Sequence, residues 1–454
     1  MNGARALNRE RDARRVLVVG LGKTGLSCAR HLAAQGWQVA VTDSREQPPA
    51  LEALRGSLPD VGLFLGGFAR QAFEHAELLV VSPGVSPDLP ELARARERGV
   101  PVVGDVELFA RAVDKPVAAI TGSNGKSTVT TLVGLMARAA GLRASMGGNL
   151  GEPVLDLLEQ PVDLHVVELS SFQLETTHSL APAVATVLNL SPDHLDRHAH
   201  FDAYAAAKGR IFEHAEVGVC NLDDPKVMAL TRPAESLFFT LGEPQGEGQF
   251  GRREVAGRTW LCRGREPLLA ADELLMPGRH NQANALAALA MGHALELPLE
   301  AMQQVLRTFP GLPHRTQFVA EGRGLRWYDD SKGTNPGATQ AALEGLEEGE
   351  GRTVLIAGGQ AKGADFGELA QAIVRHCRAL VLLGEDRRLI AAAVGDRLPV
   401  VEVETMEEAV ARAAELGRPG DRVLLSPACA SFDLFDGYEH RGRVFQACVR
   451  EVLQ

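Results

Sequence analysis

The feature that most constrains the fold of this chain is a repeated alternation of short apolar runs with longer helical segments. The runs are apolar at consecutive positions, which is typical of strands buried on both faces of a sheet. Between them lie Ala- and Leu-rich helical segments, such as 128–140 and 282–296. The pattern predicts an α/β fold with mainly parallel sheets and a small antiparallel insertion at about 237–270, where these signals are weaker. The expected strands are 16–20, 78–82, 117–121, 164–169, 185–190, 353–359, 379–384 and 422–427.

The 454 residues correspond to about three domains at roughly 150 residues each. A first unit closes near GVPVVGDVE at 99–107, and FPGLPHR at 309–315, which contains two prolines and a glycine, separates a second unit from a third. The expected domains are 1–104, of which 1–14 form a frayed basic arm, then 105–311 and 312–454.

Charge and cysteine usage narrow the class of protein. The net charge of −11 disfavours general nucleic-acid binding, although local cations can still hold an acidic small molecule. The six cysteines are scattered and form no C-x-x-C pair, which indicates reduced thiols in a cytoplasmic protein. The first residues do not resemble a secretory signal, and no apolar run reaches the ~20 residues that a membrane-spanning helix needs. We expect no membrane contact and a monomer.

The first motif is GLGKTG at 20–25, between an expected strand and a helix. Its glycines, Gly20, Gly22 and Gly25, fit the G-x-G-x-x-G pattern, which lets the backbone approach a pyrophosphate closely. Asp43 ends the next apolar run, where a ribose-binding carboxylate is expected. Taken alone, the motif indicates a dinucleotide such as NAD, or a glycine-rich turn that binds nothing.

The second motif, TGSNGKST at 121–128, also joins a strand to a helix. Backbone N–H groups of such a loop cradle phosphates, Lys126 can reach the terminal phosphate, and Ser127 can hold Mg²⁺. The loop departs from the strict P-loop pattern because Ile120 stands where the first glycine would be. It still predicts a nucleoside triphosphate site.

Two groups of polar residues follow later strands. Glu168 and the pair Asp193 and His194 each come after an apolar run, and with Lys208 they form a candidate metal group, since Mg²⁺ prefers oxygen ligands. His178, His198 and His200 are expected to be structural or solvated. The second group lies in the last unit and predicts an acidic-substrate site at the carboxyl edge of a sheet. Its members are Lys332, Thr334, Lys362, Ser426, Ser431 and Tyr438.

Eight motifs in order resemble the successive signatures of the Mur ligases, across nearly the whole chain. They are TGSNGKST, GGNLG, ELSSFQLE, NLSPDHLDRH, GRHNQANALAALA, GLPHR, DDSKGTNPGA and LLSPACASFD. The opening GLGKTGLSCAR, the turn SPG at 82–84, and the last two motifs resemble the branch that adds D-glutamate. The resemblance implies a Rossmann-like N-terminal domain, a central P-loop-type ATPase domain and a Rossmann-like C-terminal domain.

The resemblance also implies a reaction and its ligands. ATP would activate UDP-N-acetylmuramoyl-L-alanine as an acyl phosphate, and D-glutamate would form the amide. Two Mg²⁺ ions would assist, and Lys208 would react with CO₂ to give a metal-binding carbamate. Lys126, His194, Lys208 and Lys332 would be catalytic.

Binding residues carry over by position. For UDP they are Gly20, Gly22, Lys23, Thr24, Gly25, Asp43, Ser44, Arg45, Ser82, Pro83 and Gly84. For ATP they are Gly122, Asn124, Gly125, Lys126, Ser127, Thr128, Asn281, Asn284, Arg315, Asp330 and Lys332. For the muramoyl-alanine end they are Asn149, Ser170, Gln173 and His194. For D-glutamate they are Thr334, Lys362, Ser431 and Tyr438. For metal they are Ser127, Glu168, His194 and carbamylated Lys208.

Three alternatives stay open. Within the family, the chain could add another amino acid or be a folate-polyglutamating relative. An NAD-dependent dehydrogenase would explain GLGKTG but would leave the second motif and the metal group unused. A non-catalytic UDP- or ATP-binding regulator would not need the full set of charged groups.

Overall fold

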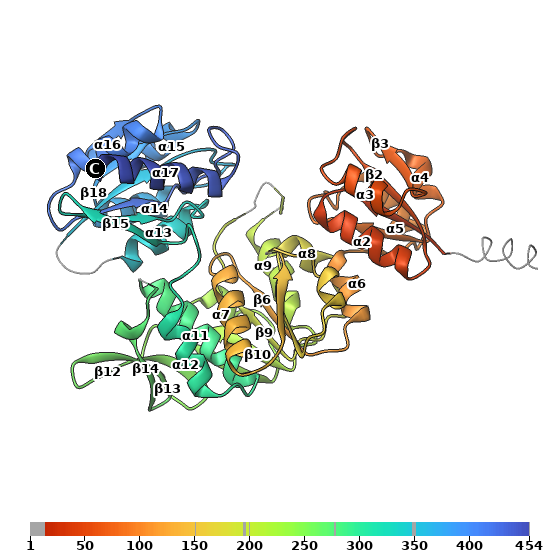
Figure 1. The fold of residues 1–454 in the computed structure, drawn as a ribbon, viewed down its shortest axis with the longest axis horizontal. Helices are drawn as coiled ribbons and strands as arrows, with labels where there is room; N and C mark the ends of the chain where they lie inside the picture. The colour runs from red at the N-terminus through yellow and green to blue at the C-terminus, as the bar shows by residue number, and fades with distance from the viewer. Residues whose placement is uncertain are drawn as a thin grey trace, which may run out of the picture.

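The computed structural model describes residues 14–149, 151–193, 197–198, 200–276, 278–346 and 351–453. Within them the chain forms three separate sheets in chain order, each flanked by helices. Figure 1 shows the three units as separate lobes, with the N-terminal and C-terminal lobes both above the central one. The expected α/β class with mainly parallel sheets is confirmed.

The N-terminal unit is a five-stranded parallel sheet in the order β3-β2-β1-β4-β5. β1 lies at its centre because RVLVV is apolar from Val16 onward and is buried between two neighbours. The strands are β1 (Arg15–Val19), β2 (Gln38–Asp43), β3 (Gly62–Leu65), β4 (Leu78–Val81) and β5 (Val102–Val103). The helices are α2 (Lys23–Ala34), α3 (Leu51–Ser57), α4 (Arg70–Glu74) and α5 (Pro90–Glu97).

The central unit is a nine-stranded sheet in the order β14-β13-β12-β11-β10-β9-β6-β8-β7. Its strands are parallel except for β12–β14, which pair antiparallel at one edge. The expected antiparallel insertion is therefore present, but β11, which falls partly inside it, is parallel to β10. The strands are β6 (Val117–Thr121), β7 (Ala144–Gly148), β8 (Leu164–Glu168), β9 (Val184–Val187), β10 (Val217–Asn221), β11 (Glu235–Phe239), β12 (Gln249–Val255), β13 (Arg258–Arg263) and β14 (Glu266–Ala270).

The helices of the central region pack on both faces of this sheet. Its two longest, α7 and α11, pack against each other through apolar side chains. The helices are α6 (Asp105–Ala112), α7 (Lys126–Ala139), α8 (Ser171–Glu175), α9 (Phe201–Gly209), α10 (Pro225–Met228), α11 (Arg279–Ala294) and α12 (Leu299–Thr308).

The C-terminal unit is a six-stranded sheet in the order β15-β16-β20-β17-β18-β19, parallel except for the β15–β16 hairpin. Its strands are β15 (Gln317–Gly322), β16 (Leu325–Asp329), β17 (Thr353–Ala357), β18 (Cys377–Leu382), β19 (Val400–Glu402) and β20 (Arg422–Leu425). Its helices are α13 (Pro336–Gly345), α14 (Gly367–His376), α15 (Arg387–Val394), α16 (Met406–Leu416) and α17 (Tyr438–Leu453).

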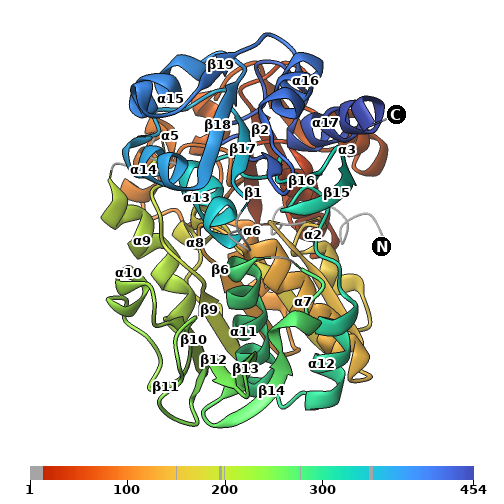
Figure 2. The same cartoon turned by 90° about the vertical axis from the view of Figure 1, so that its left-hand side faces the viewer.

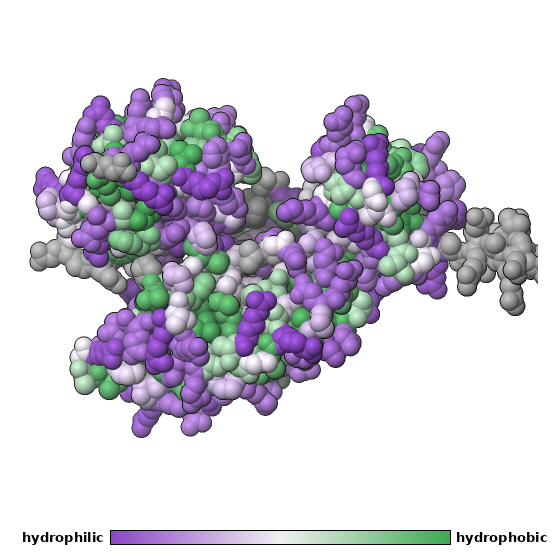
Figure 3. All heavy atoms as spheres, viewed as in Figure 1, coloured by the Kyte–Doolittle hydropathy of each residue, from purple (hydrophilic) through white to green (hydrophobic). Residues whose placement is uncertain are grey.

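The two joints of the central unit differ in chemistry. One apolar core cluster contains residues from both the first and the central units, such as Val16 and Val167. At the other joint, α13 packs near α11, as Figure 2 shows, and Arg315 donates to Ser127 at 2.7 Å. In the space-filling view of Figure 3, a hollow separates the two outer lobes.

No helix among the described residues has the length and apolar character that crossing a membrane requires. The domain limits at 104 and 311, the monomeric state and the cytoplasmic location stay predictions. The arm at 1–14 lies outside the described residues except for Arg14.

Candidate functional site

The TGSNGKST loop connects the centre of the middle sheet to α7. β6 ends at Thr121, Gly122 and Gly125 adopt positive φ angles of 151° and 84°, and α7 begins at Lys126. A Cβ on Gly125 would lie 2.4 Å from Asn284 Oδ1, so the loop requires glycine there for space as well as for conformation. Lys126 Nζ donates to the carbonyls of Gly122 and Ser123, both at 2.9 Å, which curls the side chain over the loop.

A cavity of about 490 Å³ lies beside this loop, between the central and C-terminal units. Gly122, Lys126 and Ser127 are not among its lining residues, although they belong to the same loop. The predicted ATP residues that line it are Asn124, Gly125, Thr128, Asn281, Asn284, Arg315, Asp330 and Lys332.

Buried amides and apolar side chains lie together in the lining of this cavity. Asn281 and Asn284 lie on the first turns of α11, are buried, and are joined by a hydrogen bond of 3.1 Å. The apolar side chains of Leu188, Phe239 and Leu241 line the same cavity. Apolar walls with a few fixed amides are a common setting for a nucleobase.

Arg315, Asp330 and Lys332 extend from the C-terminal unit to the nucleotide loop. The residues on both sides of Arg315 have left-handed backbones, with φ of 61° at His314 and 46° at Thr316. This bend is held by Asp330, whose Oδ1 accepts from Thr316 N at 2.9 Å. The result is that the Arg315 guanidinium crosses the joint to reach Ser127 Oγ.

The ionisable groups in this cavity have shifted pKa values. Burial raises the pKa of Asp330 to about 7, against the opposing effect of hydrogen bonds from Ser426 and Thr316. Burial, together with the charges of Arg315 and Lys126, lowers the pKa of Lys332 to about 8. Strongly shifted pKa values of buried groups in one cavity mark it as a candidate functional site.

The predicted metal group lies behind the loop. Glu168 ends β8 and is 2 % exposed; its Oε1 accepts from Asn149 Nδ2 at 2.7 Å. Its other oxygen, Oε2, is buried and has no hydrogen-bond partner among the described residues. Within the described part of the chain, no three His, Cys, Asp or Glu residues come together as a ready-made metal cage. His194 lies outside the described residues.

Lys208 is a fully buried lysine at the end of α9. Its Nζ donates to Gly122 O at 2.8 Å and to Thr121 Oγ1 at 3.2 Å. Burial and the neighbouring charge of Lys126 lower the pKa of Lys208 well below its usual range, against the attraction of Asp193 and Glu168. A lysine in this state is readily a neutral, nucleophilic amine.

The GLGKTG loop lines a second cavity of about 460 Å³. Asp43 Oδ2 accepts from Leu21 N at 2.7 Å, and its two oxygens also accept from the Arg45 guanidinium. Burial raises its pKa, but the Arg45 and backbone hydrogen bonds outweigh burial and lower the pKa of Asp43 to about 2. The predicted UDP residues in the lining are Gly20, Gly22, Lys23, Thr24, Asp43, Ser44, Arg45, Ser82, Pro83 and Gly84.

Gly25 lies outside this lining and has a packing role, because a Cβ there would lie 1.9 Å from Gly20 O. The central unit contributes Asn149 and Gln173 to the same cavity. Ser170 is not in the lining; it is the N-cap of α8 and forms a capping box with Gln173.

The predicted D-glutamate residues lie on loops that leave neighbouring strands of the third sheet. Gln360 and Ala430 exchange two hydrogen bonds of 3.0 Å, which bring the loops of Lys362 and Ser431 side by side. Lys362 is exposed and has a left-handed backbone, with φ of 49°. Lys332 Nζ lies 3.9 Å from the centre of the Tyr438 ring. Thr334 is half-buried in the loop that follows Lys332.

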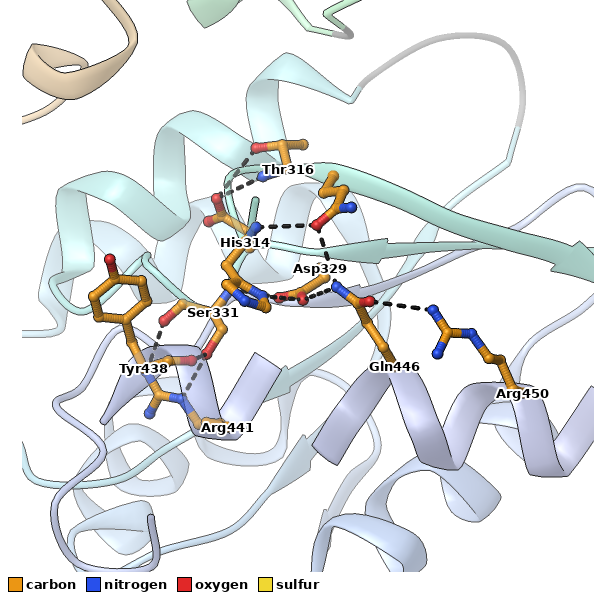
Figure 4. Close-up of polar contacts among 10 residues, drawn as sticks. His314, Thr316, Asp329, Ser331, Tyr438, Arg441, Gln446 and Arg450 are labelled. Carbon is orange, nitrogen blue, oxygen red and sulfur yellow. Dashed lines mark hydrogen bonds and ion pairs between the residues drawn. The ribbon is translucent and has the colours of Figure 1, made fainter. Parts of the chain in front are cut away.

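Sequence reasoning missed the residues that support these side chains. His314 Nδ1 and Asp329 Oδ2 are 2.6 Å apart, and Gln446 Nε2 also donates to Asp329 Oδ2, as Figure 4 shows. Arg441 binds the loops that carry Lys332 and Ser431. The only available signal was the position of these polar residues within or beside recognised motifs, which does not reveal their partners.

Models of known protein domains match all three units of the chain. A model of the MurD-like N-terminal domain of Mur ligases matches residues 14–104, one of the Mur ligase middle domain matches 120–292, and one of the glutamate ligase domain matches 314–429. The chain is 53 % identical over 439 residues to UDP-N-acetylmuramoylalanine--D-glutamate ligase of Nitrosococcus oceani, covering 96 % of each chain. It is 51 % identical over 442 residues to the Pseudomonas aeruginosa protein of that name, covering 96 % of this chain and 98 % of the relative.

Solved structures share the fold at low identity. UDP-N-acetylmuramate-alanine ligase MurC from Thermotoga maritima has a TM-score of 0.59 at 19 % identity, covering 96 % of this chain and 99 % of its own. E. coli FolC has a TM-score of 0.56 at 15 % identity, covering 77 % of this chain and 94 % of its own. The three domain matches and the two relatives above 50 % identity show that the chain belongs to the Mur ligase family.

Proposed function

We propose that this chain is the ATP-dependent ligase that adds D-glutamate to UDP-N-acetylmuramoyl-L-alanine in peptidoglycan synthesis. Its identity of 51–53 % to ligases of that name, over nearly the full length of both chains, supports this activity. The low-identity likeness to E. coli FolC concerns the fold and gives no support to a folate substrate.

The observation that carries the mechanism is one hydrogen bond from the cavity of the GLGKTG loop to the predicted metal group. Asn149 lines the cavity of the GLGKTG loop and donates to Glu168, which lies behind the nucleotide loop. A substrate whose UDP end occupies the first cavity can therefore extend its carboxylate along Asn149 toward the phosphates in the second. The NAD-dehydrogenase alternative gives no reason for such a connection.

The bond changes follow from this placement. An oxygen of the alanine carboxylate attacks the γ-phosphorus of ATP, the bond between that phosphorus and the β,γ-bridging oxygen breaks, and ADP leaves. The D-glutamate amine then attacks the acyl phosphate, loses a proton, and expels inorganic phosphate as the amide forms. Lys126, Arg315 and Lys332 offset the charge of the transferring phosphoryl group, which supplies most of the catalysis in reactions of this type.

The predicted metal site fits Mg²⁺ at the level of its donors. The unpartnered Oε2 of Glu168 and the hydroxyl of Ser127 are hard oxygen ligands of the kind that Mg²⁺ selects. When bound, Mg²⁺ would supply electrostatic stabilisation of the phosphate oxygens. His194 and carbamylated Lys208 stay predicted ligands, and two ions stay the expected number.

The chemistry of Lys208 supports the carbamate proposal. Its Nζ is buried beside Lys126, and two like charges there are unfavourable. Reaction of the neutral amine with CO₂ forms an N–C bond, releases a proton and converts the group into an anion. That anion would be attracted to the Lys126 ammonium.

The amino-acid pocket is proposed to comprise Thr334, Lys362, Ser431 and Tyr438. Lys362 supplies a cation for one carboxylate of D-glutamate and Ser431 a hydroxyl donor for the other. The left-handed backbone at Lys362 raises the free energy of the folded state by about 1 kcal/mol or more. Such strained conformations are typical of functional sites, where the direction of the side chain matters.

The test is phosphate release from ATP with Mg²⁺ and UDP-N-acetylmuramoyl-L-alanine in the presence of D-glutamate, L-glutamate, L-lysine or meso-diaminopimelate. We expect release with D-glutamate alone. Release with another amino acid would keep the reaction and refute the assignment of Lys362 and Ser431. No release in any mixture would favour the non-catalytic regulator.

A further inference from the structure

The proposed D-glutamate pocket is assembled from loops that are far apart in sequence. Lys332 and Thr334 follow β16, Lys362 follows β17, and Ser431 follows β20. These strands are neighbours in the order β16-β20-β17, so the sheet fixes the loop bases but not the loop tips. Main-chain hydrogen bonds already join the loops, from Ala428 N to Gly333 O at 2.8 Å and between Gln360 and Ala430 at 3.0 Å. A further, side-chain contact would fix the spacing that a two-carboxylate ligand requires.

Arg441 makes that contact from the first turn of α17. It is 2 % exposed, and its guanidinium donates to both sides of the pocket. Nε donates to Ser331 Oγ at 3.0 Å and Nη2 to Ser331 O at 2.9 Å, next to Lys332. Nη1 and Nη2 each donate to Cys429 O at 3.2 Å, two residues before Ser431. One planar group therefore joins the two loops.

Ser331 connects Arg441 to the main chain of Tyr438, another residue of the proposed pocket. It is fully buried, and its hydroxyl, which accepts from Arg441, donates to Tyr438 O at 2.8 Å. Figure 4 shows Ser331, Tyr438 and Arg441 in this arrangement. The Tyr438 ring in turn lies against the Lys332 ammonium. A change at Ser331 therefore acts on Lys332, Tyr438 and the Cys429 loop together.

The hydrogen bonds of Arg441 indicate a role other than core packing. Burial of a guanidinium is costly unless its donors are satisfied, and apolar side chains of similar size serve stability as well or better. Here the donors are satisfied by two main-chain carbonyls and a hydroxyl, and burial lowers the pKa of Arg441 to about 10, so the group stays a cation. The five N–H groups of arginine form a fork that can bind two loops at once, whereas lysine offers a single point of contact.

We propose that Arg441, acting with Ser331, is a positioning residue that sets the distance between the Lys332–Thr334 loop and the Ser431 loop for D-glutamate. This inference rests on the proposed function, because D-glutamate is the ligand for which the loops are spaced. Neither side chain is needed to touch the substrate.

The test is steady-state kinetics of the full chain with Ser331→Ala, Arg441→Lys and Arg441→Met, varying each substrate in turn. We expect Ser331→Ala to raise the KM for D-glutamate about tenfold, since it removes both hydrogen bonds of the Ser331 hydroxyl. Arg441→Met should raise that KM more, and Arg441→Lys should fall between it and the wild type. The KM for UDP-N-acetylmuramoyl-L-alanine should change less than threefold, and the KM for ATP should rise less than that for D-glutamate, because Lys332 also lines the nucleotide cavity. Arg443→Gln, an exposed arginine on the same helix, is the matched control.

The kinetic and stability results distinguish a positioning role of Arg441 from a purely structural one. If the melting temperature falls while the KM for D-glutamate is unchanged, Arg441 is only structural and the proposal is wrong. A rise of all three KM values in parallel also contradicts it. If the Arg441 variants do not fold, Ser331→Ala, which removes one atom, decides alone. If wild-type turnover does not depend on D-glutamate, the proposed function has failed instead of this inference.

Discussion

Arg315 offers the sharpest test of how the C-terminal unit takes part in ATP binding. Its guanidinium crosses the joint and donates to Ser127 Oγ at 2.7 Å, on the loop proposed to cradle the phosphates. When ATP is bound, we expect phosphate oxygens to take over as the acceptors of this group. Arg315→Gln removes the charge and the fork, and Arg315→Lys keeps the charge alone.

The magnitude follows from a single charge-assisted contact. Such a hydrogen bond contributes about 1.5–3 kcal/mol, which corresponds to roughly a 10- to 100-fold change in an equilibrium or rate constant. We expect Arg315→Gln to lower kcat/KM for ATP by that factor and Arg315→Lys to lose less. The matched control is Arg307→Gln, since Arg307 forms an exposed pair with Glu273 and should change kcat/KM less than threefold.

The assay is phosphate release at saturating D-glutamate and muramoyl substrate with ATP varied. If Arg315→Gln has the same kcat/KM for ATP as the control, Arg315 does not bind the nucleotide and the contact with Ser127 is merely an interdomain hydrogen bond. If kcat/KM falls for D-glutamate but not for ATP, the residue belongs to the amino-acid pocket instead.

Three further predictions follow. Lys208→Ala should lower turnover at least 100-fold, and wild-type enzyme freed of CO₂ should regain activity with bicarbonate; turnover independent of bicarbonate would contradict the carbamate. Asp330→Asn should stabilise the chain at neutral pH. Between about pH 4 and 7 the folded wild type keeps a proton on Asp330 that the unfolded chain releases. The free energy of unfolding of the wild type should therefore fall by up to about 4 kcal/mol as pH rises through that window. Urea unfolding at pH 5 and 8 checks this, and an equal difference between variant and wild type at both values would refute it. Asp43→Asn should raise the KM for the UDP substrate about tenfold and leave the KM for ATP unchanged, because Asp43 accepts a hydrogen bond from Leu21 N of the glycine loop. The control is Asp60→Asn, at an exposed position. Equal KM values for the UDP substrate in the two variants would refute a role of Asp43 in UDP binding.

Local sequence patterns predicted the strands and the two glycine loops. Runs such as 117–121 and 422–427 are strands in the structure as β6 and β20, because continuous burial demands continuous apolar residues. The two glycine loops were also predictable, since each follows a strand, opens a helix and needs positive φ angles that glycine adopts freely. Candidate residues for both cavities could be named from these motifs.

Contacts between distant segments could not be predicted in this way. Arg441 and Ser331 are 110 positions apart, and no local periodicity connects them. The left-handed backbones at His314, Thr316 and Lys362 could not be predicted from the sequence either. This conformation is uncommon in residues other than glycine, and here it depends on contacts with distant segments. The difference between the apolar and polar joints likewise depends on which faces meet in three dimensions.

In the proposed mechanism the muramoyl-alanine carboxylate attacks the γ-phosphorus of ATP and forms an acyl phosphate, which the D-glutamate amine then attacks. The direct measurement uses UDP-N-acetylmuramoyl-L-alanine labelled with ¹⁸O in both carboxylate oxygens, with mass analysis of the phosphate released in the presence of D-glutamate. Attack by the carboxylate should place one ¹⁸O atom in each phosphate released with the amide product. Unlabelled phosphate accompanying amide formation would mean that no acyl phosphate forms and would refute this mechanism.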